Sequence, residues 1–233
     1  MSEPGGNRAE AKAARPPLDG AVFLDRDGVI NALVYNAEFG TVDSPANPGE
    51  YEQLPGVGEA VARLNALALR VIVASNQPGI AKGKLSHALL DEITAKMKAG
   101  IEAGGGRLDA VYYCLHHPEA RVSELRMNCD CRKPRPGLLL RAAREWNLDL
   151  ARCYLVGDGI SDIQAGAAAG VRTFFLSSRK CYICDELVRQ STRPGFIAAS
   201  LGEAASLIEK LEAGQAVPEA EFRFPCGTFE ART

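Results

Sequence analysis

Two pairs of aspartates are the residues best placed to do chemistry in this sequence. Asp25 and Asp27 lie in DRDGV, directly after the apolar run AVFL, and Asp158 and Asp162 lie in GDGISD, directly after YLV. Clustered carboxylates repel one another and raise each other's pKa unless a cation neutralises them. Their oxygens suit a hard ion such as Mg²⁺, which also binds substrate phosphate. A single aspartate would fit a solvated turn equally well, but the two pairs together predict a Mg²⁺ site.

A second group of residues has the spacing of zinc ligands. Cys114 lies in CLHHP, and Cys129 and Cys131 form CDC further along the chain. In a reducing compartment, closely spaced cysteines are metal ligands more often than disulfide partners. With either His116 or His117, the three thiolates supply the four ligands of a tetrahedral Zn²⁺. Because four protein ligands leave no open position, the predicted Zn²⁺ is structural.

Apolar runs and amphipathic segments alternate along the chain, and each alternation predicts a strand followed by a helix. We expect strands over residues 21–25, 70–75, 109–115, 153–158 and 171–176. We expect helices over residues 56–69, 86–106, 135–148, 162–170 and 201–214. Continuous apolar strands that alternate with helices are typical of a parallel sheet covered on both faces. The sequence therefore predicts an α/β fold with a doubly wound parallel sheet.

The predicted strands end at residues with functional side chains. Asp25 ends the first strand, Ser75 the second, Cys114 the third and Asp158 the fourth. In parallel α/β sheets, ligands bind outside the carboxyl ends of the strands. These four groups come from separate stretches of the chain and converge on one edge, so we predict the functional site at that edge.

Composition narrows the classes of protein and partner. The chain has 233 residues, a net charge of −2 and 46% hydrophobic residues, which is enough for one globular domain with a core that needs no disulfides. Near-neutral charge argues against a nucleic-acid or membrane-surface partner. We find no apolar run long enough to span a membrane, and the first residues lack the apolar segment of a secretion signal. We therefore expect a cytoplasmic protein, and we expect it to be a monomer.

The four segments DRDGV, VASNQ, CRKPRPG and VGDGISD resemble, in order and spacing, the motifs of the haloacid dehalogenase-like phosphatases. The resemblance implies a Rossmann-like core and a Mg²⁺-dependent hydrolysis of phosphate monoesters. It implies that Asp25 is the nucleophile that forms an aspartyl-phosphate, and that Asp27 protonates the leaving oxygen and then activates water. It further implies that Ser75 and Lys133 bind the phosphoryl group. Asp158 would hold Mg²⁺ together with Asp25 and the backbone carbonyl of Asp27.

The segments YYCLHHPE and CDCRKPRPG resemble the zinc loop of heptose bisphosphate phosphatases and of the related histidinol-phosphate phosphatases. This resemblance selects His116 as the fourth zinc ligand. It implies D-glycero-D-manno-heptose 1,7-bisphosphate as the substrate, cleaved at the 7-phosphate, with Asn76 and Gln77 orienting it. Arg132 lies between Cys131 and Lys133, so the zinc loop would direct two cations at a sugar phosphate.

Other functions remain open at this point. The runner-up enzyme is a histidinol-phosphate phosphatase or a broader sugar phosphatase. A different class of function is a zinc-loop binding module on an inactive phosphatase fold, although the intact Asp25, Asp27, Lys133 and Asp158 argue against it.

Composition and the matched motifs together suggest how the chain is organised. We expect a flexible leader over 1–18, a phosphatase domain over 19–214 with a zinc loop over 114–131, and a tail over 215–233. CYIC at 181–184 has a metal-like spacing but no partner pair nearby, and we expect no metal there.

The residues between Asp27 and Ser75 suffice for a small flap but not for a full cap domain, so we expect an open site. Two features depart from the family. The flap segment at 31–56 is longer than usual, and Gly159 stands where the heptose enzymes often carry a longer polar or basic residue. Both departures bear on the substrate rather than on the chemistry.

Overall fold

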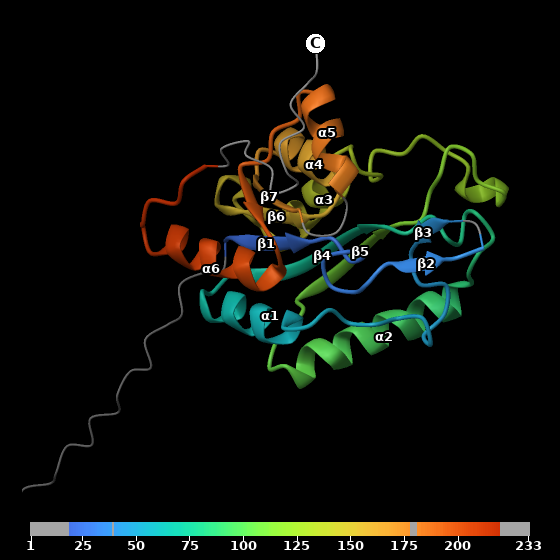
Figure 1. Cartoon of the computed structure of the whole chain (residues 1–233), viewed down its shortest axis with the longest axis horizontal. Helices are drawn as coiled ribbons and strands as arrows, with labels where there is room; N and C mark the ends of the chain where they lie inside the picture. Colours follow the sequence, from blue (N-terminus) through green and yellow to red (C-terminus); the bar gives the residue numbers. More distant parts are fainter. Residues whose placement is uncertain (1–18, 39, 178–180, 220–233) are drawn as a thin grey trace, which may run out of the picture.

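The main sheet of the protein has six parallel strands. The computed structural model describes residues 19–38, 40–177 and 181–219, and Figure 1 shows the arrangement. The sheet has the order β5-β4-β1-β6-β7-β8, and β2 and β3 form a separate antiparallel hairpin. The strands are β1 (Ala21–Leu24), β2 (Val34–Asn36), β3 (Thr41–Asp43), β4 (Arg70–Asn76), β5 (Ala110–Cys114), β6 (Tyr154–Gly157), β7 (Arg172–Leu176) and β8 (Phe196–Ala198).

Helices cover both faces of this sheet, with α1, α2 and α6 on one face and α3, α4 and α5 on the other (Figure 1). The helices are α1 (Val57–Ala66), α2 (His87–Ala103), α3 (Gly137–Trp146), α4 (Ile160–Ala169), α5 (Cys181–Arg189) and α6 (Leu201–Glu212), with 3-10 turns at Ser123–Leu125 and Leu150–Arg152. The predicted doubly wound parallel sheet is confirmed.

Strand β1 contributes to the core on both faces because successive side chains of a strand point in opposite directions. Val22 and Leu24 pack in the cluster that includes residues of α1, α2 and α6. Ala21 and Phe23 pack in the cluster that includes residues of α3. All four residues are fully buried, which explains why the segment is continuously apolar rather than alternating.

The chain reverses its direction of winding at β1. Residues of β1 pair in parallel with β4 on one side, through Ala21 and Arg70, and with β6 on the other side, through Val22 and Tyr154. Crevices for ligands form outside the carboxyl ends of strands at such a reversal. Asp25 therefore leaves the sheet at its most favourable position for a binding site.

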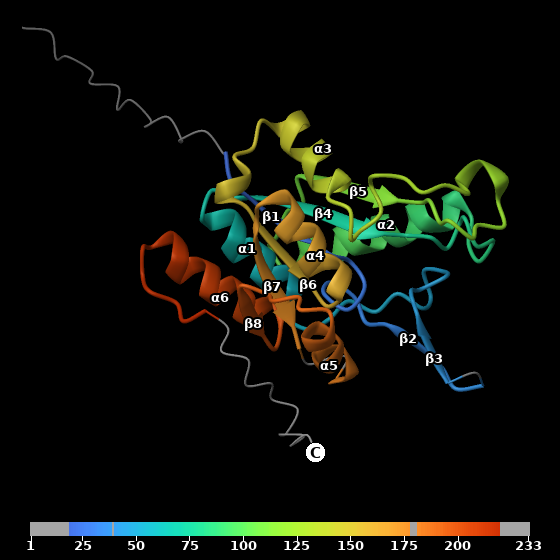
Figure 2. The ribbon, with the colours of Figure 1, turned by 90° about the horizontal axis from the view of Figure 1, so that it is seen from above.

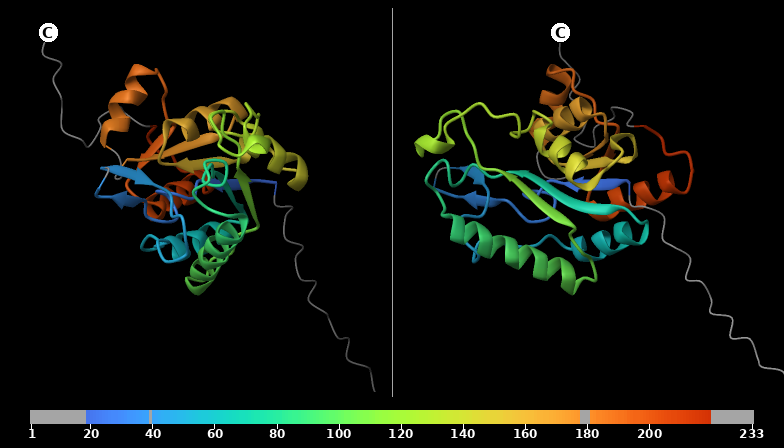
Figure 3. Two further views of the ribbon diagram at one scale, coloured as in Figure 1. Left: turned by 90° about the vertical axis from the view of Figure 1, so that its right-hand side faces the viewer. Right: turned by 180° about the vertical axis from the view of Figure 1, so that it is seen from behind.

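Two connections extend beyond the carboxyl ends of the strands, on the same side of the molecule (Figures 2 and 3). One is the flap, which we define as residues 31–55 and which contains the β2–β3 hairpin. The other is the loop after β5, which leads through the 3-10 turn at Ser123–Leu125 to α3. In the part of the chain that the structure describes, no separate cap domain is present.

Several elements differ from the sequence prediction. Helix α5, strand β8 and the hairpin of the flap were not predicted as elements. Strand β8 is only three residues long, and it depends on tertiary contacts: it pairs with β7, and Phe196 stacks on Phe174 with ring centroids 4.7 Å apart. The short strands β2 and β3 are largely exposed, so hydrophobic periodicity gives them no signal.

The predicted domain limits remain predictions. The leader at 1–18 and residues 220–233 of the tail lie outside the described residues, and so do the side chains of Cys181 and Cys184. Across the described ranges, no helix combines the length and the apolar character needed to cross a bilayer.

Helices α1 and α2 approach closely at two glycines. A Cβ atom on Gly58 would lie 2.7 Å from the Cα of Gly104, whereas a Cβ on Gly202, the equivalent second residue of α6, would come no closer than 3.6 Å to Ser200 Oγ. We expect Gly58→Ala to lower the free energy of unfolding by about 1–3 kcal/mol through overpacking. Gly202→Ala, the matched control, should raise it by about 0.5–1 kcal/mol. Urea unfolding of both variants tests this; equal effects would contradict the packing argument.

Candidate active site

Lys133 and Asp25 form the centre of the candidate site. Asp25 directly follows β1, and the Nζ atom of Lys133 lies 2.9 Å from Asp25 Oδ1. Lys133 Nζ also donates to the Ala74 carbonyl of β4 at 2.7 Å and to Asp162 Oδ1 at 2.5 Å. Burial opposes the charge of Lys133, but Asp162 and Asp25 outweigh it and raise the pKa of the ammonium. Burial likewise opposes ionisation of Asp25, but Lys133 and the Ser75 hydroxyl hold its pKa below the ordinary value.

Three carboxylates gather beside Lys133. Asp25, Asp158 and Asp162 each offer an oxygen within 4.8 Å of the others, and Asp158 and Asp162 are buried. Burial raises the pKa of Asp162 to about 7, and the charges of Asp25 and Asp158 add to this effect while Lys133 opposes it. A divalent cation would relieve this repulsion, and an all-oxygen donor set matches the preference of Mg²⁺. The residues present therefore fit Mg²⁺.

The backbone at Gly28 is part of the same arrangement. Gly28 has a φ of +83°, and a Cβ there would lie 2.0 Å from Asp158 Oδ2. Only glycine allows the loop after β1 to pass this close to the carboxylate.

Asp27 lies apart from this cluster and is bound by five hydrogen bonds. Arg26, which is fully buried, donates through Nε to Oδ1 at 3.0 Å and through Nη2 to Oδ2 at 3.1 Å. Asn31 Nδ2 donates to Oδ1 at 3.0 Å. Gln77 Nε2 and Ser44 Oγ donate to Oδ2 at 2.7 and 2.8 Å. The two aspartates of DRDGV therefore have different surroundings, one facing an ammonium and other carboxylates, the other enclosed by donors.

The side chains of Asn76 and Gln77 bind protein groups. Asn76 Nδ2 donates to the Lys133 carbonyl and Asn76 Oδ1 accepts from the Lys133 amide, both at 3.0 Å. Gln77 Nε2 also lies 3.1 Å from Ser75 Oγ. In this structure the two amides bind Lys133 and Asp27, and their predicted role in orienting the substrate stays a prediction.

A cavity of about 230 Å³ opens between these residues and the flap. Its walls include the three clustered carboxylates and, from the flap, Leu33, Val42, Asp43 and Ser44. The remaining lining residues are Asp27, Asn76, Gly159 and Ser161. The structure brings Asp25, Asp27, Ser75, Asn76, Gln77, Lys133 and Asp158 to one edge of the sheet.

Sequence reasoning missed two residues of this site as functional candidates. Asp162 was grouped with Asp158 as a pair of carboxylates, but the family resemblance named only Asp25, Asp27 and Asp158 as Mg²⁺ ligands. Its signal is the spacing, because Asp158 directly follows β6 and Asp162 lies in the first turn of α4, where its carboxylate accepts from the Gly159 amide at 3.1 Å. Ser44 had no local signal, since only the fold of the flap brings it to Asp27.

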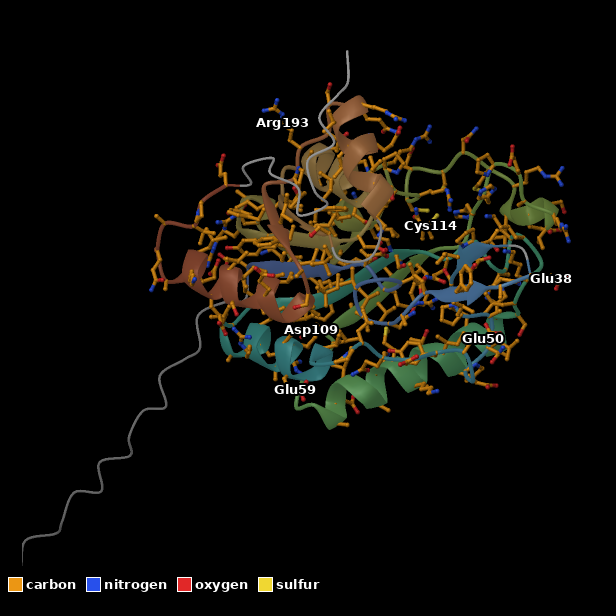
Figure 4. The ribbon with its side chains drawn as sticks, viewed as in Figure 1. Glu38, Glu50, Glu59, Asp109, Cys114 and Arg193 are labelled. Atoms are coloured by element: carbon orange, nitrogen blue, oxygen red, sulfur yellow. The ribbon has the colours of Figure 1, made fainter. Side chains whose placement is uncertain are left out.

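The four predicted zinc ligands also come together, close to the carboxyl end of β5, where Figure 4 labels Cys114. The Sγ atoms of Cys114, Cys129 and Cys131 lie 3.3–3.5 Å apart, and His116 Nδ1 lies 3.3 Å from the sulfur of Cys131. Zn–S bonds of about 2.3 Å in a tetrahedron separate the sulfurs by about 3.8 Å, and disulfide bonds are far shorter. The donor set and spacing fit Zn²⁺.

His117 points elsewhere in the same loop. Its Nδ1 accepts a hydrogen bond from the Glu119 amide at 3.1 Å, and the group of potential metal ligands contains His116 instead. The alternative that the residue spacing left open is therefore resolved geometrically in favour of His116 as the neighbour of the three cysteines.

Arg132 is not among the residues that line the cavity of about 230 Å³. Its Nη1 atom donates to the His116 carbonyl at 3.3 Å. It lines an adjacent cleft of about 160 Å³ together with Lys133, Arg135, Met127 and other residues of the loop. The loop that carries the predicted zinc ligands thus holds the Arg132 guanidinium through the His116 carbonyl.

Comparison with known proteins agrees with this geometry. A family model described as HAD-hydrolase-like matches residues 130–204. The D-glycero-beta-D-manno-heptose-1,7-bisphosphate 7-phosphatase of Escherichia coli K12 is 41% identical over 153 residues, which are 66% of this chain and 76% of the relative. The Vibrio cholerae protein of the same name is 39% identical over 156 residues, 67% of this chain and 80% of the relative.

Solved structures lead to the same group. A D,D-heptose 1,7-bisphosphate phosphatase from B. bronchiseptica, complexed with magnesium and phosphate, is 32% identical with a TM-score of 0.68, covering 82% of this chain and 99% of that chain. A D,D-heptose 1,7-bisphosphate phosphatase from Burkholderia thailandensis is also 32% identical, with a TM-score of 0.57, covering 80% and 96%.

The sheet, the carboxylate cluster and these matches define a phosphatase of the haloacid dehalogenase-like class. Within that class, the chain belongs to the family of the heptose 1,7-bisphosphate 7-phosphatases. The family resemblance inferred from the sequence motifs is confirmed.

The two adjacent histidines, His116 and His117, allow a direct test of the predicted zinc site. We expect protein purified without chelator to contain one Zn²⁺ per chain. His116→Ala should lose most of it, because a ligand is removed, and His117→Ala should retain it. Elemental analysis measures both, with circular dichroism as the control for folding. Loss of zinc in His117→Ala alone, or no zinc in the wild type, would contradict the assignment.

Proposed function

We propose that this protein removes the 7-phosphate of D-glycero-D-manno-heptose 1,7-bisphosphate through an aspartyl-phosphate on Asp25. The observation that carries the proposal is the pairing of the Asp25 carboxylate, which lines the cavity, with the buried Lys133 ammonium 2.9 Å away. The names of the relatives support the choice of substrate.

In the first half-reaction, a carboxylate oxygen of Asp25 forms a bond to phosphorus while the bond from phosphorus to the sugar oxygen breaks. Asp27 gives its proton to that sugar oxygen, so the sugar leaves as a neutral alcohol. The Lys133 ammonium offsets the repulsion between a dianionic phosphate and the Asp25 carboxylate, which is electrostatic stabilisation of the kind that preorganised charges supply.

In the second half-reaction, Asp27 takes a proton from a water molecule as the water oxygen attacks phosphorus. The bond from phosphorus to Asp25 breaks, phosphate leaves and both aspartates return to their starting states. Splitting a very slow hydrolysis into two steps is the general advantage of covalent catalysis.

Mg²⁺ would be held by Asp25, Asp158 and the backbone carbonyl of Asp27, and it would supply neutralisation of the phosphate charge. We add Asp162 to this site, because its carboxylate belongs to the same cluster and also contacts Lys133. The magnesium and phosphate in the B. bronchiseptica structure support this part of the proposal.

We propose a structural role for Zn²⁺ on Cys114, His116, Cys129 and Cys131. It would order the loop that ends at Arg132 and Lys133, and Ser75 and Lys133 would bind the transferred phosphoryl group. Arg132 would grip the second phosphate of the substrate from the adjacent cleft. A cytoplasmic monomer with no nucleic-acid or membrane partner remains our expectation.

The role of Asp25 as nucleophile is tested by an almost isosteric substitution. Asp25→Asn should abolish turnover of p-nitrophenyl phosphate without unfolding the protein, because a neutral amide is a poor nucleophile. Asp27→Asn should accumulate phosphorylated Asp25, which intact-mass measurement detects. Asp91→Asn, an exposed acid on α2, is the control and should retain activity. Appreciable turnover by Asp25→Asn would refute the assignment.

The role of Arg132 is tested by comparing substrates with one and two phosphates. A guanidinium binds phosphate oxygens in bidentate fashion, and losing one charge-assisted contact lowers kcat/KM by roughly tenfold to a hundredfold, or about 1.5–3 kcal/mol. We expect the wild type to prefer heptose 1,7-bisphosphate over heptose 7-phosphate, and Arg132→Ala to lose most of that preference.

Arg121→Ala, an exposed arginine of the same loop, should keep the preference. If the wild type handles both heptose phosphates equally, or prefers histidinol phosphate, the heptose assignment is wrong while the phosphatase chemistry stands.

A further inference from the structure

Ser44 is the flap residue that reaches the candidate acid. Its hydroxyl donates to Asp27 Oδ2 at 2.8 Å, although the two residues belong to different parts of the chain. Ser44 is half-buried and lines the cavity. The contact joins the flap to the one carboxylate that must change its protonation state twice in the proposed reaction.

The chemistry of Ser44 differs from that of the other partners of Asp27. Arg26, Asn31 and Gln77 all bind this carboxylate through nitrogen and donate to it. These bonds suit an ionised carboxylate. A hydroxyl is both a donor and an acceptor, so Ser44 can donate to ionised Asp27 and, after rotation about its Cβ–Oγ bond, accept from protonated Asp27. Among the partners of Asp27 in the described structure, Ser44 alone is a hydroxyl.

Contacts on both sides of Ser44 hold it in place. Asp43 Oδ1 accepts from the Ser44 amide at 2.9 Å, and the carboxylate of Asp43 pairs with Lys84. On the other side, Glu50 accepts hydrogen bonds from the Ala46 amide and from Asn47. Figure 4 places Glu50 beside the end of α2, and Glu38 at the outer part of the flap. Ser44 directly follows β3, and hydrogen bonds and an ion pair constrain the chain on both sides of it.

We propose that Ser44 is a positioning residue that keeps Asp27 competent as a proton donor to the leaving group. The proposal rests on the proposed role of Asp27 as the acid. Ser44 itself exchanges no proton with substrate: it only reverses its hydrogen bond as Asp27 gains and loses its proton. Without that hydroxyl, Asp27 Oδ2 loses its contact with the flap, and the carboxyl group is less well oriented toward the leaving oxygen.

Two substrates whose leaving groups differ in their need for a proton distinguish this positioning role from a purely structural one. p-Nitrophenolate leaves readily without a proton, whereas phenolate is a much stronger base and depends more on the acid. The two phosphate esters share the same ring, so contacts with the flap are closely similar. The ratio kcat/KM reports only steps up to loss of the leaving group, so the later action of Asp27 on water does not enter.

The experiment measures kcat/KM of the full chain for p-nitrophenyl phosphate and phenyl phosphate. Ser44→Ala should lower kcat/KM about tenfold or more with phenyl phosphate and less than about threefold with p-nitrophenyl phosphate. The larger loss is a part of the roughly 10²–10⁴-fold that general acid catalysis contributes. Ser44→Thr, which keeps the hydroxyl, should recover most of the loss. Ser44→Cys, nearly the same size but a weak hydrogen bonder, should resemble Ser44→Ala and serves if the alanine variant unfolds.

Two controls distinguish the possible failures. Thr41→Ala removes an exposed hydroxyl from strand β3 and should leave kcat/KM unchanged for both esters. Lys84→Met breaks the ion pair between Lys84 and Asp43 of the flap. It should lower kcat/KM for both esters by a similar small factor. Equal losses for the two esters in Ser44→Ala, or no loss, would overturn the role of Ser44. If Asp27→Asn lowers kcat/KM by the same factor for both esters, the assignment of Asp27 as the acid fails. The Ser44 proposal then fails with it.

Discussion

The burial of the Lys133 ammonium is the constraint on which the rest of the site depends. Removing an ion from water costs several kcal/mol even after relaxation, and Lys133 is only 3% exposed. Its charge is tolerated because Asp25, Asp162 and the Ala74 carbonyl surround it. These partners come from the loop after β1, from α4 and from β4, so the ammonium is stable only when three separate parts of the sheet edge are assembled.

The same constraint explains why the loop after β5 is tied down so closely. Asn76, at the end of β4, makes two hydrogen bonds to the backbone of Lys133, and the cluster of three cysteines and His116 ends just before Arg132. One short segment thus connects a group of soft sulfur ligands to a group of hard oxygen ligands. The separation of the two ligand types follows from their chemistry, because thiolates and imidazole suit Zn²⁺ whereas carboxylates suit Mg²⁺.

The parts of the structure that the sequence predicted are those with a strong local signal. Strand β1 is a continuous apolar run, and Ser86, the first residue of the helix predicted over 86–106, caps α2 by accepting from the Leu89 amide at 3.2 Å. The convergence of Asp25, Ser75 and Asp158 follows from parallel strands ending at one edge. By contrast, Ser44 and the amides of Asn76 and Gln77 have roles set by contacts between distant segments. No periodicity or motif in the flap encodes the contact with Asp27, because it exists only once the flap has folded over the sheet.

Two glycines beside the carboxylate cluster differ in how far evolution can change them. At Gly28 every missense change adds a Cβ, which would lie 2.0 Å from Asp158 Oδ2 on a backbone with φ of +83°, so this position is closed to substitution. At Gly159 the φ is −123° and an added Cβ would lie 3.1 Å from Asp162 Oδ2, which a small shift can accommodate. Gly159 also lines the cavity. Although both glycines belong to one site, the backbone excludes every other residue at Gly28 and leaves room for a side chain at Gly159.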